Sequence, residues 1–332
     1  PLQYSDQRNH PMEFSKSDVS NSTGGDYPVV FGYNLQDVID GKNLTSYVKW
    51  AVSRGAVITY YWQTHNPLTG GLSKDCSTNG TNQRSVISEI LNEETNAHAM
   101  FMGWLDTISD FFLSLNIHGE AVPVIFRPFH ECSADWYWWG TACAEDEDFL
   151  ALWLMTQDYL MNTRGVHNIL WEYAPSKPAD QYDVSFHDRW PGDERVDIVG
   201  FDRYSQPENY RNDILRDCRA VTDFSNAHGK IAAMSETGIL TGINTITDEE
   251  YFNFFTEDFL LPMMEECPSI SFALTFSNFN TGKYWVPLPG QPTYDSFLSF
   301  YNDEQTYFLK DSRWRQVEYV TEIEKVIGRA LI

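Results

Sequence analysis

Seven short apolar runs, spaced along the chain by stretches of helical periodicity, most strongly constrain how this sequence can fold. The runs are rich in Val, Ile and aromatic residues, and they are nearly continuous rather than alternating. Strands that are buried on both faces have this composition, and their alternation with helices is typical of a parallel sheet covered by helices. The predicted strands are residues 29–33, 56–62, 122–127, 168–173, 196–201, 230–234 and 270–276.

Apolar residues recur at helical spacing in the stretches between these runs, so we expect helices there. One of them begins with four acidic residues, Glu145 to Asp148, which suit the positive end of a helix dipole. The expected helices cover approximately residues 37–52, 93–115, 147–162, 209–228, 248–266 and 314–330.

The pattern predicts an α/β fold, a (β/α)8 TIM barrel, although such a barrel needs eight strands and seven are visible. The first strand is therefore either upstream of residue 1 or irregular and hidden in the polar residues 1–28. No composition break marks a linker, and no repeat longer than the βα unit is present. We expect residues 1–332 to form a single catalytic barrel domain.

Polar side chains follow the ends of successive predicted strands. They are His65, Glu131, Tyr204, Glu236 and Asn278. The carboxyl ends of all barrel strands meet on one face, and that face carries the chemistry in such folds. We therefore expect these five residues to contribute to one site.

The segment from Ala121 to Gly140 is the most informative. Its strand turns polar at Arg127, passes His130 and Glu131, and enters an aromatic loop at residues 136–139. Aromatic faces pack on the apolar faces of sugar rings, so a carboxyl group in this setting is typical of a site that cleaves sugars. The alternative is a structural strand end, in which Glu131 pairs with Arg127 and the tryptophans are core. The second and third of those tryptophans fit a loop core as well as a sugar platform.

Cleavage of a glycosidic bond needs one carboxylic acid to protonate the leaving oxygen and a second carboxylate to attack or to activate water. Glu131 and Glu236 end different strands, and a separation of about 5 to 5.5 Å would make them a retaining pair. A tryptophan-lined setting and a nearby carboxylate should raise the pKa of the acid, Glu131. Donors such as Tyr204 should keep Glu236 ionised, while Arg127 holds carboxylates and Asp202 anchors a strand end.

Composition excludes several classes of function. The net charge of −24 repels nucleic acid and anionic membranes, and no run reaches the roughly 18 to 20 apolar residues of a membrane span. The sequence has no GxGxxG, GxxxxGK[ST], GxSxG or HExxH motif. A neutral substrate suits this chain, and we expect no cofactor and no metal.

Five cysteines are an odd number, so at least one is free or pairs between chains. The absence of a CxxC pair argues against a zinc site. Cys132 and Cys143 flank the aromatic loop and could be bridged. A thiol nucleophile at Cys132 is disfavoured, because no His–Asn constellation accompanies it.

Several motifs resemble glycoside hydrolase family 26, and the resemblance extends from about Asp18 along essentially the whole chain. It rests on FRPFHE followed by Trp136 and YWWG, on VGFDRY at residues 199–204 and on SETG at residues 235–238, supported by GDYPVVFGYN and THNP. The resemblance implies a clan A (β/α)8 barrel, typically a β-1,4-mannanase that acts by double displacement with retention. The family barrel also begins with a strand upstream of a segment like residues 1–20, which favours the missing-strand explanation.

The resemblance also implies roles for individual residues. Glu131 matches the family's acid/base and Glu236 its nucleophile. His130 matches the histidine that precedes the acid, Trp136 an aromatic platform near the scissile sugar, and Tyr204 the tyrosine that contacts the nucleophile.

Three further residues are expected to bind substrate. His65 matches a histidine lining the −1 or −2 region. Phe276 and Asn278 stand at the end of the last strand, where the family often has Trp-Arg-Asn. The arginine of that motif is replaced by Ser277 here, so the usual arginine contact to a distal sugar is not expected.

The expected function is a retaining endo-β-1,4-mannanase that hydrolyses mannan, galactomannan or glucomannan. Alternatives are a relative that cleaves mixed-linkage β-glucan or β-1,3-xylan, an exo-acting mannobiohydrolase, and a non-catalytic carbohydrate-binding barrel. The start at Pro1 reads as a mature or trimmed form. We expect a monomer that is secreted or in the cell envelope, with no nucleic acid partner and no membrane span.

Overall fold

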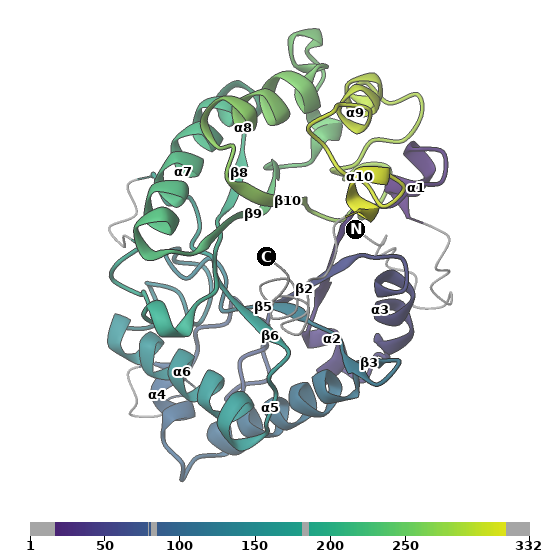
Figure 1. The fold of residues 1–332 in the computed structure, drawn as a ribbon. Coiled ribbons are helices and arrows are strands. Elements are labelled where there is room, and N and C mark those ends of the chain that lie inside the picture. Colours follow the sequence, from purple (N-terminus) through teal and green to yellow (C-terminus); the bar gives the residue numbers. More distant parts are fainter. Residues whose placement is uncertain (1–16, 79, 81–84, 181–185, 317–332) are drawn as a thin grey trace.

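The computed structural model describes residues 17–78, 80, 85–180 and 186–316, and within them parallel strands curl into a nearly closed barrel with helices outside (Figure 1). Neighbouring strands are paired in the order β1, β2, β5, β6, β7, β9, β10, and β8 also pairs with β9. The bounds are β1 (Val30–Asn34), β2 (Val57–Trp62), β5 (Val124–Pro128), β6 (Ile169–Tyr173), β7 (Ile198–Val199), β8 (Asp202–Ser205), β9 (Ile231–Ile239) and β10 (Ile270–Thr275).

All seven predicted runs contain strands, so the barrel prediction is confirmed. The run at 196–201 ends early, and the chain resumes as β8 after Gly200 and Phe201. No strand lies between residues 17 and 29, where the chain forms α1 (Asp18–Ser22) instead. The remaining question about a first strand falls on residues 1–16, outside the described residues.

Helices follow most of the strands and form the outer layer of the barrel (Figure 1). No helix in the described parts of the chain is long and apolar enough to cross a membrane. The α-helices are α2 (Gln36–Ile39), α3 (Thr45–Val52), α4 (Val86–Leu91), α5 (Asn96–Ser114), α6 (Asp146–Asp158), α7 (Pro207–His228), α8 (Leu261–Glu266), α9 (Tyr294–Tyr301) and α10 (Ser312–Arg315), and a small hairpin pairs β3 (Asn116–Ile117) with β4 (Glu120–Ala121).

Two predicted helices are interrupted. The one expected at 37–52 divides into α2 and α3, because the chain turns at Gly41 with a φ of +85°, which favours glycine. The one expected at 248–266 is a 3₁₀ turn, a π-helix at Phe254–Leu260 and then α8. Pro262 has no N–H to donate to the carbonyl four residues earlier, so one α-helical hydrogen bond is missing there. Regular α-helix begins only with α8. Most of the helix expected at 314–330 lies outside the described residues.

The barrel interior holds a small apolar layer that is separate from the main core. One residue from each of five strands contributes to it, which is how the inside of such a barrel is filled. These residues are Val57, Ile125, Ile198, Ala233 and Phe272. The main core lies between the strands and the outer helices.

The barrel has a seam where the sheet ends. Strands β1 and β10 are its two edges, and within the described residues no backbone ladder joins them. Side chains bridge part of the gap, since Leu274 approaches Gly32 so closely that a Cβ there would lie 3.1 Å from it. An apolar groove of about 500 Å³ opens along the seam, lined by both strands and by Phe297, Phe300 and Phe308.

Two disulfides tie the loops and helices together, and they correct one prediction. Cys143 pairs with Cys76 and not with Cys132, which is a buried free thiol. The reason is that the loop after β2 packs on the aromatic loop, where the Trp138 N–H donates to the Ser73 carbonyl at 2.9 Å. The second disulfide joins Cys218 of α7 to Cys267 at the end of α8.

Candidate active site

A tight turn after β5 presents Glu131. Phe129 and Glu131 both have left-handed backbone, with φ values of +51° and +55°. This conformation costs about 1 kcal/mol or more for each non-glycine residue, and such strain gathers at functional sites. Hydrogen bonds hold the turn, because the Glu131 N–H donates to the Ala174 carbonyl at 2.8 Å and the Trp139 indole donates to the His130 carbonyl at 2.9 Å.

Glu236 lies inside a strand and not beyond its end, because β9 continues to Ile239 where the sequence predicted a stop at residue 234. The parallel register sets Glu236 opposite Asp202 of β8. The phenol of Tyr204, two residues further along β8, donates to Oε2 of Glu236 at 3.0 Å. The neighbouring strand thus supplies a donor that fixes this carboxylate.

Arg127 connects two carboxylates from the base of the site. Its side chain is 2% exposed. Nη1 donates to both carboxylate oxygens of Asp202 at 2.6 and 2.5 Å, and Nη2 donates to Oε1 of Glu236 at 2.5 Å. Such charge-assisted, forked bonds fix geometry strongly. The guanidinium therefore forms ion pairs with Asp202 and Glu236. The alternative ion pair between Arg127 and Glu131 does not form.

Glu131 has different surroundings. Its Oε2 accepts a hydrogen bond from the indole of Trp136 at 2.8 Å. Burial, and then the charge of Glu236, raise the pKa of Glu131 to about 7. Glu131 therefore keeps its proton up to near neutral pH, whereas Glu236 accepts hydrogen bonds from Arg127 and Tyr204. Pairs of carboxyl groups with such contrasting environments are the pattern of acid and nucleophile.

The groups converge in a small volume. Ligand atoms of His130, Glu131 and Asp202 all lie within 4.8 Å of one another. These three residue types could bind a metal ion. However, Asp202 is already neutralised by Arg127, whose positive charge disfavours a second cation beside it. The donor set therefore fits proton transfer and ion pairing better than metal binding.

His130 is 3% exposed and lies among aromatic rings, with centroids of Tyr61, Tyr137 and Trp139 at 5.6, 5.2 and 6.0 Å. Burial, and then the charge of Arg127, hold the pKa of His130 well below its usual range, so the ring is neutral. Its buried Nδ1 has no hydrogen-bond partner within the described residues.

The aromatic loop divides into two parts. Trp138 and Trp139 are fully buried, so they are loop core, as the structural alternative held. The indole of Trp138 donates to the Thr64 carbonyl at 3.1 Å, and the Tyr137 and Trp139 rings stack at 4.4 Å. Trp136 is partly exposed and is the tryptophan of this loop that reaches Glu131.

The other predicted substrate contacts differ from one another. Phe276 is partly exposed, with its ring centroid 6.4 Å from that of Tyr204, and His65 is half-buried just beyond β2. Asn278 is buried. Its amide nitrogen donates to the Val286 carbonyl at 2.7 Å, and its oxygen accepts the N–H groups of Trp285 and Val286. Asn278 therefore holds the loop after β10 together, and its predicted contact with a sugar stays a prediction.

Sequence reasoning missed Arg189, which holds the aromatic loop in place through hydrogen bonds to its backbone carbonyls. Its guanidinium is 1% exposed and donates to the carbonyls of Cys132, Trp139 and Ala144, at 3.0, 2.7 and 2.6 Å. It also pairs with Asp146 at 2.7 Å. No pattern could have identified this residue, because it lies in an aperiodic stretch some fifty residues from the loop that it holds.

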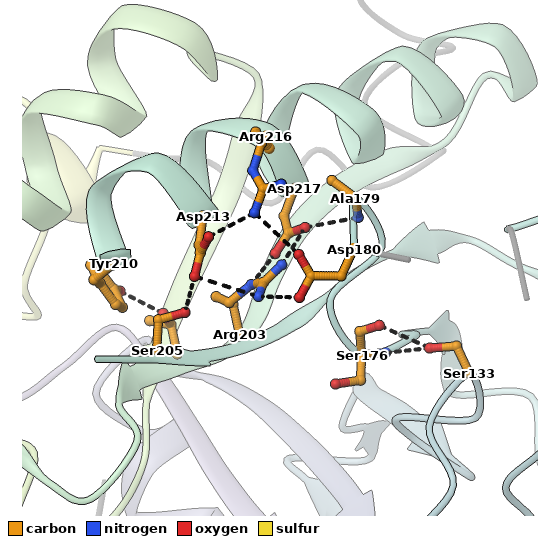
Figure 2. A network of polar contacts seen from close by, with 11 residues as sticks. Ser133, Ser176, Ala179, Asp180, Arg203, Ser205, Tyr210, Asp213, Arg216 and Asp217 are labelled. Carbon is orange, nitrogen blue, oxygen red and sulfur yellow. Dashed lines mark hydrogen bonds and ion pairs between the residues drawn. The ribbon is translucent and has the colours of Figure 1, made fainter. Parts of the chain in front are cut away.

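A second polar cluster supports Tyr204 from the outside of the barrel. Figure 2 shows Arg203 of β8 surrounded by Asp180, Asp213 and Asp217. The Asp180 contact is 2.8 Å, and Asp217 of α7 accepts two hydrogen bonds from the guanidinium. Because Arg203 and Tyr204 point to opposite sides of the strand, the cluster fixes the strand that carries the Glu236 donor.

Comparison with known proteins agrees with this geometry. A family model described as glycosyl hydrolase family 26 matches residues 9–258 of this chain, which is well over half of it. The chain belongs to glycosyl hydrolase family 26.

Several known proteins are similar to this chain in sequence or structure. A mannan endo-1,4-β-mannosidase of Bifidobacterium adolescentis is 28% identical over 305 residues, which cover 84% of this chain and 29% of that protein. This chain thus spans less than a third of that relative. A family 26 β-mannanase from Bacteroides ovatus superposes with a TM-score of 0.81 at 28% identity, covering 94% of this chain and 90% of its own. A modular endo-β-1,4-mannanase from Cellulomonas fimi gives a TM-score of 0.82 at 25% identity, covering 96% and 72%.

Proposed function

We propose that this family 26 barrel is a retaining endo-β-1,4-mannanase, with Glu131 as acid/base and Glu236 as nucleophile. The observation that carries the proposal is the contrast between these two buried carboxyls. Glu131 has a pKa raised to about 7, whereas Glu236 accepts hydrogen bonds from Arg127 and Tyr204. The names of the relatives described above support β-mannan as the substrate.

In the first step, Glu236 attacks the anomeric carbon and forms a carbon–oxygen bond while the glycosidic bond breaks. Glu131 donates its proton to the departing oxygen, so that the leaving sugar is released as an alcohol. Arg127 and Tyr204 hold the attacking carboxylate in one orientation, which reduces the entropy lost on reaching the transition state.

In the second step, Glu131 removes a proton from water, which attacks the same carbon and frees Glu236. The electrostatics favour this change of role. Once Glu236 is esterified it has lost the negative charge that helps to raise the pKa of Glu131. The pKa of Glu131 should then fall, which makes its carboxylate the stable form and suits a general base.

The test is to offer mannan, lichenan and β-1,3-xylan side by side and to follow the anomeric configuration of the first product by proton NMR. We expect cleavage of mannan with the β-anomer formed first. An α-anomer as first product would contradict the double displacement. Binding of mannan without any hydrolysis would favour the non-catalytic barrel.

The alternatives within the enzyme class are separated by the same assay and one more. Faster cleavage of lichenan or β-1,3-xylan would replace mannan as the substrate. The products from mannohexaose separate endo from exo action, because an exo-acting mannobiohydrolase at early times yields only mannobiose and the remaining mannotetraose. We further propose that the protein works as a monomer. We also propose that it works in an extracytoplasmic, oxidising compartment, and the two disulfides support this second proposal.

A further inference from the structure

A fourth carboxyl group lies inside the barrel and has no part in the mechanism proposed above. Glu172 stands on β6, one residue before that strand ends, and its side chain is fully buried. Its Oε1 accepts a hydrogen bond from the hydroxyl of Ser235. Because Ser235 directly precedes Glu236 in β9, this contact joins the strand of the proposed nucleophile to β6, across the short strand β7 that lies between them.

Gly200, just after β7, leaves the space that the contact between Glu172 and Ser235 occupies. A Cβ at residue 200 would lie 2.6 Å from Oε1 of Glu172 and closer still to the Ser235 hydroxyl. Neither position is open to a real side chain, so the two polar groups pack directly against bare backbone. Close packing of this kind leaves Glu172 and Ser235 little freedom to move.

The charges around Glu172 include more carboxylates than cations. The charged groups that face it are Arg127 of β5, Asp202 of β8 and Glu236 of β9. The two residues of β7 carry no charge. The guanidinium of Arg127 already forms hydrogen bonds with Asp202 and Glu236. A third carboxylate would therefore add a buried negative charge without a cation of its own, which is strongly unfavourable.

The hydrogen bonds of Glu172 fit a neutral carboxyl group. Its Oε2 is buried and has no hydrogen-bond partner within the described residues. An ionised Glu172 would be left with a single neutral donor, whereas Asp202 accepts two hydrogen bonds from a guanidinium. Burial, which Arg127 and Ser235 oppose only in part, also raises the pKa of Glu172. Protonation is therefore more favourable at Glu172 than at Asp202.

We propose that Glu172 is a positioning residue that works in its neutral, protonated form. Through Ser235 it fixes the backbone that carries Glu236. Because it bears no charge, it leaves the positive charge of Arg127 to Asp202 and Glu236. The proposal rests on the function proposed above and deepens it. Glu172 and Ser235 are 0% and 2% exposed, so they act on the nucleophile and not on the substrate.

The first test is the pH profile of kcat/KM for Glu172→Gln, which can accept the hydrogen bond from Ser235 but can never ionise. If Glu172 is neutral in the wild type, the variant should keep kcat/KM within about twofold and the acid limb should stay in place. If Glu172 were ionised, the variant would lose a negative charge near Glu236. The acid limb would then move to lower pH by about half a unit or more, which would overturn the proposal.

The second test removes the contact. Ser235→Ala lacks the donor and Glu172→Leu lacks the acceptor, so each should lower kcat about three- to tenfold with little change in KM. The double variant should lose no more than the worse single variant, because both changes remove one interaction. The matched control is Ser109→Ala on the outer helix α5, where a buried hydroxyl donates to the Asp106 carbonyl at 2.8 Å. It should lose stability and keep its kcat. An unchanged kcat in Ser235→Ala, or an equal loss in the control, would refute the positioning role.

A third measurement does not depend on the substrate. In the infrared difference spectrum at neutral pH, the wild type should show the C=O stretching band of one protonated carboxyl group that Glu172→Gln lacks. Loss of carboxylate bands instead would show that Glu172 is ionised and would overturn the proposal, even if mannan is hydrolysed as proposed. Full activity of Glu236→Ala, in contrast, would overturn the proposed function, and the positioning of a nucleophile with it.

Discussion

The indole of Trp136 donates a hydrogen bond to the carboxyl group of Glu131 over 2.8 Å. The sequence suggested Trp136 only as a surface for a sugar ring, but its N–H also acts on the proposed acid. A donor favours the ionised form of a carboxyl group, so this bond lowers the pKa of Glu131 and opposes the effect of burial.

The pH profile should report this balance. With Glu131 as the acid, kcat/KM of the wild type should fall as the pH rises through about 7, because the proton is then lost. Trp136→Phe removes the donor and keeps an aromatic ring, so the alkaline limb should move to higher pH. A limb that stays in place or moves down would contradict the role of the N–H.

The same raised pKa has a consequence for stability. The folded-state pKa of Glu131 lies above its ordinary value of 4.5. Its contribution to the free energy of unfolding is therefore fully present below that value and is lost as the pH rises through about 7. Glu131→Gln cannot ionise, so its unfolding free energy should depend less on pH over this interval than that of the wild type.

Substitution of the two carboxyls should separate their roles. Glu131→Ala and Glu236→Ala should each lower the hydrolysis of mannan by several orders of magnitude. With an aryl mannobioside, whose leaving group needs no protonation, Glu131→Ala should still release the phenol in a rapid first turnover. Glu236→Ala should not, because the attacking group is missing. A burst from the Glu236 variant, measured by stopped-flow absorbance, would reverse the assignment.

Tyr204→Phe should lower kcat about 10- to 100-fold with a smaller change in KM, because a hydrogen bond to a charged group contributes about 1.5 to 3 kcal/mol. The control is Tyr210→Phe, which removes the phenol that meets the Thr237 hydroxyl at 2.5 Å, one residue from Glu236. That variant should be less stable by about 1 kcal/mol but nearly fully active. Equal kcat losses in both would mean that Tyr204 acts only through stability.

The two disulfides should differ in what they protect. Removing Cys76–Cys143 detaches the loop after β2 from the aromatic loop, so Cys76→Ala/Cys143→Ala should lose both melting temperature and kcat/KM. Removing Cys218–Cys267 affects only the outer helices α7 and α8. That double variant should lose about 2 to 4 kcal/mol of stability and keep its kcat/KM at 20 °C, measured by melting curves and initial rates.

Periodicity predicted the strands well because most of them consist largely of buried residues, with β5 buried throughout, and the long helices α5 and α7 agree closely with the predicted spans. Interruptions were harder to predict, since they depend on a single residue such as Gly41 or Pro262. In the site, the order of polar residues along the strands pointed to Glu131, Glu236 and Tyr204, which the structure brings together.

Predictions failed where long-range contacts decide the outcome. Arg189 binds three carbonyls of a loop remote in sequence, and Cys143 has its partner on another loop. The contacts by which Asn278 holds its own loop and reaches Asp18 were not predicted either. Neither spacing nor composition records such pairings, which depend on how distant segments pack.

Within the part of the chain that the structure describes, β1 and β10 share no backbone ladder, and this gives the barrel a line of weakness between the two strands. A barrel in which backbone hydrogen bonds join every pair of neighbouring strands has no preferred place to open. A barrel with one pair of edges that share no ladder opens there most easily. Thermal breathing should therefore start where Leu274 faces Gly32, on the flank of the barrel, and spread from there toward the strands that carry the carboxyls.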